Sequence, residues 1–364
     1  MQQSNTRKWR PWLYRIMVSL GVALYFLPTA FQVSAQDLNF SQFYELPLLR
    51  NPALGGVFVG DVRVQSLYRN QWQSVTVPFR TSGLSAEVNF PMNDYGHYLT
   101  TGAQVLHDVA GDSKLTRTHL MPFVTYHVPI GGNEMYLSGS IMGGMVNNRF
   151  DPTGLRWDDQ YQGGQFDPAN PTRQVLTQTG RNYVDINAGL ALSGLLTENI
   201  SFYTGVGVFH ANSPNVAFQN DNVRLGRKWA FNGGVTIETS DWHRLTFYGD
   251  LFVQSASGTA ANATRVGSQQ VALIGAFYTT DLAQYDTDDK VSLSIGGIYR
   301  WADAFAPVCR LDLKQWSVGL SYDVNTSQLT KASGARGGFE LTLAWKNVFK
   351  SRILQQYRLK CVGF

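Results

Sequence analysis

Apolar and polar residues alternate along most of the chain, in segments of about ten residues that end in turn-forming residues. In residues 84–90 every second side chain is apolar, and residues 245–253, 291–296 and 339–345 repeat the pattern. Because neighbours in a strand point to opposite faces, each segment predicts a strand with one apolar face and one polar or small face. Such segments lie at residues 61–70, 80–90, 97–107, 115–128, 134–147, 182–194, 200–211, 228–239, 244–256, 268–280, 290–301, 310–324 and 336–346.

These segments favour an all-β fold, a transmembrane antiparallel β-barrel, over a soluble sandwich. Many span ten residues or more, which suits a tilted strand that crosses a bilayer in about 9–11 residues. Short connections at 128–133 and 238–241 contrast with a long polar loop at 147–181, an asymmetry typical of outer-membrane barrels. Such barrels have an even number of strands, so thirteen segments predict that one strand is missed. Fourteen strands are expected and twelve are the next alternative; a soluble secreted β-protein is the remaining fold alternative.

Composition agrees with a barrel. Charged residues make up 15% of the chain, whereas a soluble domain usually has about 25%. The net charge of +4 is mild and indicates no nucleic-acid partner. Aromatic residues gather near segment ends, as expected for girdles at the membrane interfaces: Tyr68, Trp72, Tyr278, Tyr299, Trp301 and Trp345.

The N-terminus predicts a cleaved secretory signal peptide at residues 1–35. A basic region is followed by an apolar run at 16–27, and small residues precede a cleavage site between Ala35 and Gln36. The alternative, a membrane anchor, is disfavoured because the run is shorter than the roughly 20 residues of a spanning helix. The mature chain then divides into an N-terminal periplasmic segment at 36–60, the barrel at 61–346 and a basic periplasmic tail at 347–364. Both termini are expected in the periplasm, because the strand number is even.

The residues that could carry chemistry do not form a recognisable site, so we expect neither an enzyme nor a cofactor or metal. The six histidines are scattered, without zinc-binding or hydrolase spacing. His107 and Asp108 could form half of a proton-transfer pair, but neighbours in a strand point to opposite faces. The acidic runs at 286–289 and 158–159 supply only part of a Ca²⁺ shell. The exported compartment permits a disulfide between Cys309 and Cys361, which the spacing alone does not establish.

Several motifs, in order along the chain, resemble the PorP/SprF family of outer-membrane proteins associated with type IX secretion and gliding motility. They are QDLNFSQFY at 36–44, NPALGG at 51–56, YRNQW at 68–72, HDVAG at 107–111, WDDQY at 157–161, GGIYR at 296–300 and VGLSYDVN at 318–325. The strand at 336–343 also resembles the terminal-strand signal read by barrel-assembly machinery. The last four residues, CVGF, depart from the Cys-Pro-Arg-Phe ending common in the family.

The resemblance implies a non-enzymatic barrel in the outer membrane of a Gram-negative, Bacteroidota-type envelope, in contact with outer-membrane lipid. Its partner would be a cell-surface protein of adhesin or gliding type exported by type IX secretion, or periplasmic secretion or motility components. The barrel would aid the export or the surface anchoring of that protein. The alternatives are a channel or transporter for small solutes and a barrel enzyme. The basic tail could instead be a disordered end. Candidate partner contacts are Tyr68, Arg69, Asn70, Trp72, Trp157, Asp158, Asp159, Arg352, Arg358 and Lys360.

Overall fold

The computed structural model describes residues 40–71, 77–92, 95–131, 135–174, 176–219, 222–255, 269–286, 289–327, 330, 334 and 336–347. The predicted signal peptide and the basic tail lie outside these residues, as does Cys361. Cys309 is exposed on the outer face of its strand. Because Cys361 is not among the described residues, a disulfide between the two stays a prediction.

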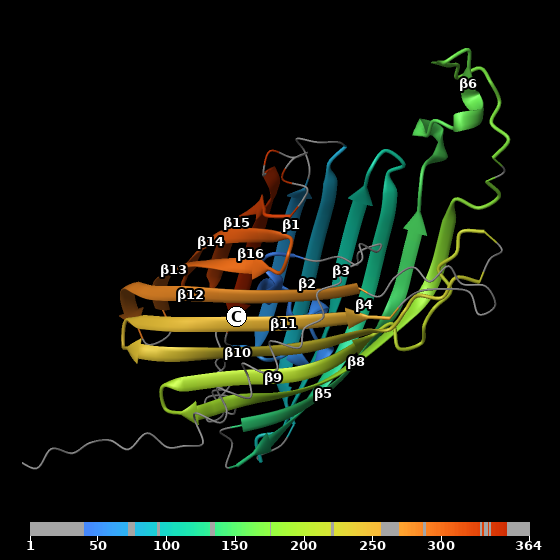
Figure 1. Cartoon of the computed structure of the whole chain (residues 1–364). Helices are drawn as coiled ribbons and strands as arrows, with labels where there is room; N and C mark the ends of the chain where they lie inside the picture. The colour runs from blue at the N-terminus through green and yellow to red at the C-terminus, as the bar shows by residue number, and fades with distance from the viewer. Residues whose placement is uncertain are drawn as a thin grey trace, which may run out of the picture. The chain divides into compact units, whose positions relative to one another are not determined.

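Within the described residues, fourteen antiparallel strands form a closed barrel (Figure 1), which confirms the fold prediction. Each strand pairs with its neighbours in the chain, and the first and last strands pair with each other to close the sheet. The barrel strands are β1 (Val62–Gln71), β2 (Phe79–Pro91), β3 (Tyr98–Ala110), β4 (Leu115–Ile130), β5 (Met135–Arg149), β8 (Gly180–Thr197), β9 (Ile200–Phe209), β10 (Lys228–Ser240), β11 (His243–Gln254), β12 (Gln269–Asp286), β13 (Asp289–Arg300), β14 (Ala304–Leu313), β15 (Trp316–Asn325) and β16 (Arg336–Asn347).

The two ends of the barrel differ in their connections. At one end, hereafter the short-turn end, strands are joined by brief turns such as 198–199, 241–242 and 314–315. The opposite end, hereafter the loop end, carries the long connections 150–179 and 210–227. The start of β1 and the end of β16 pair at the short-turn end, so the strand series begins and ends on the same side.

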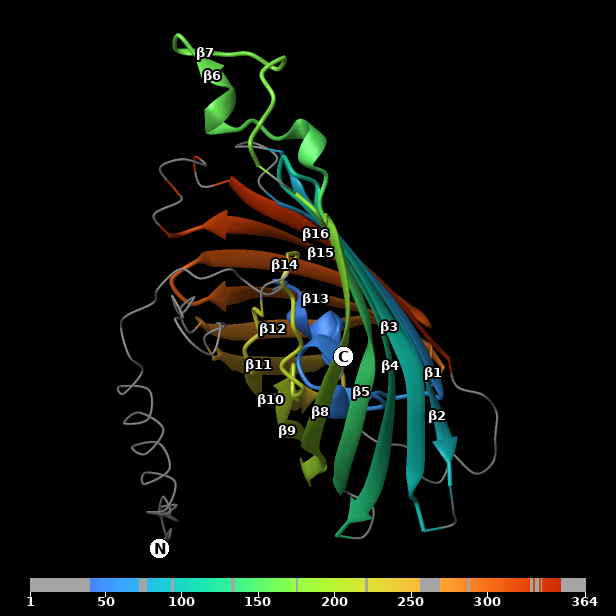
Figure 2. The ribbon, with the colours of Figure 1, turned by 90° about the vertical axis from the view of Figure 1, so that its right-hand side faces the viewer.

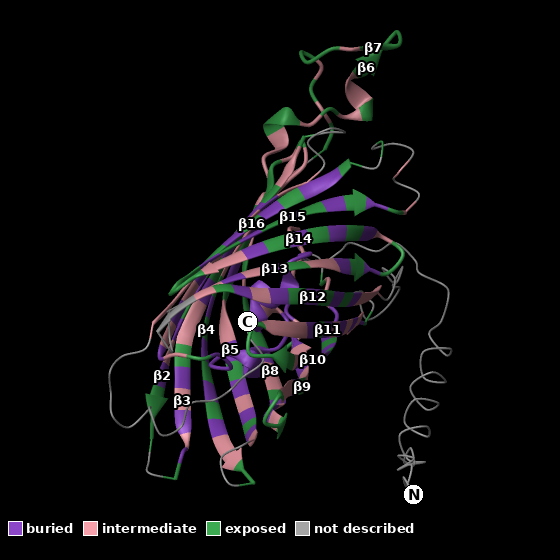
Figure 3. Cartoon of the chain, turned by 90° about the vertical axis from the view of Figure 1, so that its left-hand side faces the viewer, coloured by how far each residue is buried: buried purple, intermediate pink, exposed green. Residues whose placement is uncertain are grey.

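Apolar side chains cover the outside of the barrel, and polar side chains face its lumen. Along many of the strands in Figure 3, bands of buried residues alternate with bands of exposed or intermediate residues. Outward residues such as Ile141, Leu190 and Ile295 are 64%, 56% and 58% exposed. Inward residues such as Ser85 and Asn232 are buried. Apolar surface that surrounds a barrel in this way requires hydrocarbon rather than water as its solvent. Among the described residues, no helix combines the length and the apolar composition that crossing a bilayer requires.

The lumen also has an apolar core, to which a segment from the N-terminus contributes. Figure 2 shows this segment, in blue, between the walls of strands. It consists of three short 3-10 helices: η1 (Phe43–Glu45), η2 (Pro47–Leu49) and η3 (Pro52–Leu54). Tyr44 stacks on Tyr248 of β11 at 5.2 Å between ring centroids and meets Phe277 of β12 edge-on at 5.0 Å. Aromatic contacts therefore join the segment to the wall opposite β1 to β3.

Candidate functional site

Residues 40–58, hereafter the plug, occupy the lumen and are almost entirely buried. Proline at the first position of η2 and of η3 fixes the backbone for a tight turn. Asn51 caps η3, because its side-chain oxygen accepts the amide of Ala53 at 2.9 Å. The sequence predicted a periplasmic segment at 36–60, whereas residues 40–58 of it lie inside the barrel. The reason is that the plug combines apolar side chains with polar groups that match charges on the inner wall.

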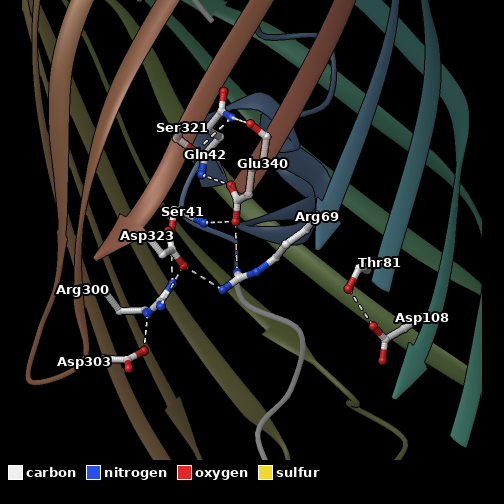
Figure 4. Close-up of polar contacts among 10 residues, drawn as sticks. All are labelled: Ser41, Gln42, Arg69, Thr81, Asp108, Arg300, Asp303, Ser321, Asp323 and Glu340. Atoms are coloured by element: carbon white, nitrogen blue, oxygen red, sulfur yellow. Dashed lines mark hydrogen bonds and ion pairs between the residues drawn. The ribbon is translucent and has the colours of Figure 1, made fainter. Parts of the chain in front are cut away.

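The first anchor of the plug is a carboxylate on the wall that accepts hydrogen bonds from two backbone amides of the plug (Figure 4). The two oxygens of Glu340 on β16 accept the amides of Ser41 and Gln42, each at 2.7 Å. The Ser41 hydroxyl donates to Asp323 on β15. A buried carboxylate with two amide donors makes charge-assisted hydrogen bonds, which are stronger than neutral ones. The start of the plug is thus held to β15 and β16.

Two arginines balance these carboxylates. Arg69 on β1 lies 3.0 Å from an oxygen of Asp323 and 3.0 Å from an oxygen of Glu340. Arg300 on β13 contacts Asp323 at 3.2 Å and also pairs with Asp303 in the following turn. All but Asp303 are buried. The network therefore connects β1, β13, β15 and β16 to one another, and its two carboxylates also hold the plug.

The second anchor lies on β9 to β11. Arg50 donates twice to Asp250, at 2.6 and 2.7 Å, and also bonds the hydroxyl of Tyr203. Next to it, the amide of Asn51 donates to Asn232 at 3.0 Å, and Asn232 donates back to the carbonyl of Arg50 at 3.0 Å. A bidentate arginine–carboxylate pair fixes geometry as well as charge. This part of the plug is therefore oriented and not merely packed.

Two further anchors lie toward the short-turn end. Glu45 pairs with Arg310 on β14 at 2.5 Å, and Arg310 also pairs with Asp312 at 2.9 Å. On the opposite wall, Glu87 accepts the amide of Gly56 at 2.7 Å and the guanidinium of Arg63 at 2.6 Å. The plug is thus bound to several sides of the barrel. The arrangement fixes a buried segment of chain inside the lumen.

A second feature is the loop element at residues 151–174, which projects at the loop end in Figure 1. It contains η4 (Pro152–Gly154), η5 (Asp158–Gln160) and a hairpin of β6 (Tyr161–Gln162) and β7 (Gln165–Phe166). The carboxylate of Asp159 accepts the amide of Arg173 at 2.6 Å and the hydroxyl of Thr172 at 3.2 Å. At its base, hydrogen bonds from Thr153 hold the pKa of the Asp151 carboxyl below its usual range. The loop element is therefore organised by its own contacts.

The candidate contact residues separate into different environments. Asp158 is exposed on the loop element, and Trp157 and Asp159 are half-buried there. Arg69 faces the lumen and holds the plug, whereas Tyr68 packs against Phe339 on the outer face at 5.9 Å between ring centroids. Asn70 shares the outward side of β1 with Tyr68. The others lie outside the described residues: Trp72, Arg352, Arg358 and Lys360.

The residues considered for catalysis and metal binding are not brought together. His107 faces outward and bonds Thr118 at 2.9 Å, while Asp108 bonds Thr81 at 2.6 Å on the other face of β3. In the part of the chain that the structure describes, no group of three histidine, cysteine or acidic side chains could hold a metal ion. The side chains of the acidic run at 286–289 lie outside the described residues.

Comparison with known proteins gives one family. The model described as type IX secretion system membrane protein PorP/SprF matches residues 32–345. None of the curated proteins compared with the chain matches it. The toluene transporter TbuX of Ralstonia pickettii is 10% identical, with 87% of this chain and 96% of that one covered and a TM-score of 0.49. A FadL homologue of Pseudomonas aeruginosa is 9% identical over 81% and 92% of the two chains, with a TM-score of 0.47.

Proposed function

Because the chain belongs to the PorP/SprF family of type IX secretion system membrane proteins, we propose that it is a closed outer-membrane anchor for a type IX partner. The partner is a secreted cell-surface protein of adhesin or gliding type, or a periplasmic component of the secretion machinery. The barrel aids the export or the surface anchoring of this protein and carries out no catalysis of its own.

The observation that carries this proposal is the plug. Buried ion pairs of Arg50 with Asp250 and of Glu45 with Arg310 tie it to β11 and β14, and the amide hydrogen bonds to Glu340 tie it to β16. Removing one partner of a buried ion pair typically costs about 3–5 kcal/mol, so these two pairs disfavour spontaneous opening. A barrel filled in this way is better suited to display and anchoring than to free diffusion of solutes.

The two ends of the barrel suit two kinds of contact. Short turns face the periplasm and long loops face the exterior in outer-membrane barrels, so we assign the loop end to the cell surface. The loop element at 151–174 then offers exposed Asp158 and Tyr161 to a surface partner. The end of β16 lies at the short-turn end, and the basic residues that follow it would be available to periplasmic components.

Surface proteomics of a deletion strain tests the proposal. We expect the deletion to remove one or more secreted proteins from the cell surface, and the wild-type gene to restore them. A variant with Trp157→Ala and Asp158→Asn should restore the barrel but not the surface protein, if that partner binds the loop element. The matched control is Gly163→Asn at the tip of the same element, where no atom lies within 4 Å of an added Cβ. A surface profile that the deletion leaves unchanged would exclude the proposal.

The alternative is a channel for small solutes, which the many polar side chains of the inner wall favour. It requires that the plug leave the lumen or that a path remain beside it. Planar-bilayer recording separates the two functions: stable, large single-channel currents from the purified wild-type barrel would support the channel and count against a closed anchor.

A further inference from the structure

On one part of the inner wall, three long polar side chains are buried although their terminal polar atoms form no hydrogen bond within the described part of the chain. Arg63 and Gln65 on β1 and Gln104 on β3 are at most 1% exposed. Nη1 and Nη2 of Arg63, and both amide atoms of each glutamine, have no hydrogen-bond partner within the described part of the chain. Buried polar groups in native proteins are nearly always paired with protein, water or an ion. These six atoms, two of Arg63 and two of each glutamine, therefore indicate that this part of the wall can bind a polar ligand.

The register of the strands brings these side chains to one place. Gln65 and Gln104 both pair with Ser85 of β2, from opposite sides. Two strand spacings separate their Cα atoms by roughly 10 Å, so both amides can reach a group above the short serine side chain. Arg63 lies two residues from Gln65 on the same face of β1. The three residues, hereafter the orphan patch, thus face one region between the wall and the plug.

The plug borders the orphan patch on both sides. Toward the loop end, Leu46 of the plug belongs to an apolar cluster with Leu67 and Leu106, the next inward residues of β1 and β3. Toward the short-turn end, the ring of Phe58 lies 4.4 Å from the guanidinium carbon of Arg63. An occupant of the patch would therefore contact wall and plug together and would strengthen the hold of one on the other.

The chemistry of the patch identifies the class of occupant. The free ends of Arg63, Gln65 and Gln104 present many more N–H donors than acceptors. Glu87 already contacts Arg63 through Nε, which leaves the outer fork of the guanidinium for another acceptor. Lys346, the register partner of Arg63 on β16, lies within electrostatic reach of both Arg63 and Arg310. The carboxylates of Asp312 and Glu45 lie within the same reach of Lys346, and Arg310 pairs with both of them. The excess of buried N–H donors, rather than net charge, suits an oxyanion.

We propose that Arg63, Gln65 and Gln104 form a binding site for a small inorganic oxyanion of the phosphate or sulfate type, held between the plug and strands β1 to β3. Arg63 binds the anion through its outer guanidinium nitrogens, and the two amides donate to its remaining oxygens. Lys346, which is only partly buried at the short-turn end, marks the side from which the anion enters. A bound anion would stabilise the contact between the plug and the wall. This proposal does not depend on the partner proposed above.

The test uses the full-length barrel purified in detergent and freed of phosphate and sulfate. Thermal unfolding is followed as inorganic phosphate is added at constant ionic strength, with chloride as the comparison. We expect phosphate to raise Tm until the effect saturates, and chloride not to do so, because a ligand that binds only the folded state stabilises it. Equilibrium dialysis with labelled phosphate should find a single saturable site per chain.

The decisive variant is Gln65→Leu with Gln104→Leu. It should lose the phosphate response and the saturable site, yet unfold at the same Tm as the wild type or higher without phosphate, because unpaired amides are replaced by apolar groups. Ser193→Ala is the matched control: this buried hydroxyl on β8 also has no partner, and its removal should leave the response intact. The proposal is overturned if wild-type protein binds no phosphate, if chloride acts equally, or if the double variant keeps the response.

Discussion

Arg69 is a single lumen residue on which the attachment of the start of the plug depends. It holds Asp323 and Glu340 together, and these two carboxylates in turn hold the first residues of the plug. Asp323 keeps Arg300 as a second cation in direct contact, whereas Arg300 acts on Glu340 only from a longer range. Removal of Arg69 would therefore leave like charges close together in a buried setting, which is far costlier than the loss of a surface contact.

We predict that Arg69→Met lowers the free energy of unfolding by about 3–5 kcal/mol, because a buried charge loses its partner. Lys114→Met is the control, since Lys114 and Asp151 are 3.9 Å apart with side chains 72% and 43% exposed. An exposed pair contributes only about 0–1 kcal/mol. Denaturant unfolding of both variants in detergent measures the difference, and equal losses would mean that the lumen network adds no stability.

A glycine on the inner wall makes room for the plug. An added Cβ at Gly189 would lie 1.9 Å from the side-chain oxygen of Asn51, so one of the two must move. We predict that Gly189→Ala destabilises the barrel by about 1–3 kcal/mol, the range typical of overpacked cores. Gly249→Ala on β11, where no atom lies within 4 Å, should be neutral or slightly stabilising. A stability comparison in which the two variants behave alike would place the Asn51 contact in doubt.

At the scale of elements, the strands followed from the alternating pattern except in one place. The pattern predicted a single strand at 310–324, whereas β14 ends at Leu313 and β15 begins at Trp316. Pro307 lies inside β14 and lacks the amide that a strand normally uses, which hides the first half of that strand. The turn itself places Lys314 at φ 56° without glycine or asparagine. The rule that such barrels have an even number of strands nevertheless predicted the fourteenth strand, although the pattern did not show where it lies.

The plug could be predicted only in part. Arg69 stood out as a motif residue, and Asp250 and Glu340 stand at polar positions of alternating strands. A single acidic residue that faces the lumen predicts a cation or hydrogen-bond donors nearby, because a buried charge is costly without a partner. The sequence does not say what does so, because Arg50 pairs with a residue 200 positions away and Ser41 with one 299 positions away. Such pairings come from the closed sheet and not from any local pattern.

Contacts within the loop element organise its outer part, whereas the amide of Asp151 joins its base to the turn between β3 and β4 by donating to Ser113 at 2.8 Å. Asp159 receives donors from Thr172 and Arg173 on the returning part of the loop. We predict that Asp159→Ala loosens residues 151–174, so that limited proteolysis there becomes severalfold faster, while the barrel keeps its Tm because local opening is independent of global unfolding. Thr153→Ala at the base of the element serves as a milder comparison. Unchanged cleavage in Asp159→Ala would show that the carboxylate does not organise the loop.

At the scale of the whole molecule, orientation in the membrane can be measured by labelling. In a variant with Cys309→Ser and Cys361→Ser, we predict that Gly163→Cys in the loop element reacts with an impermeant maleimide on intact cells. Glu198→Cys, in the turn between β8 and β9, should react only after the outer membrane is permeabilised, because short turns face the periplasm. Labelling of Glu198→Cys on intact cells, with none of Gly163→Cys, would reverse the orientation.

The plug decides whether the barrel is an anchor or a pore, and its deletion tests this. Without residues 40–58, Asp250, Glu340 and Arg69 would face an emptied lumen and become hydrated. A fourteen-strand wall is wide enough that water and ions would follow them. We predict that the deletion variant, once shown to be folded by its heat-modifiable migration in gels, gives stable single-channel currents in planar bilayers, whereas the wild type does not. A folded deletion variant that stays silent would mean that side chains of the wall close the lumen without the plug. The ion pairs described above would then orient the N-terminal segment without sealing the barrel.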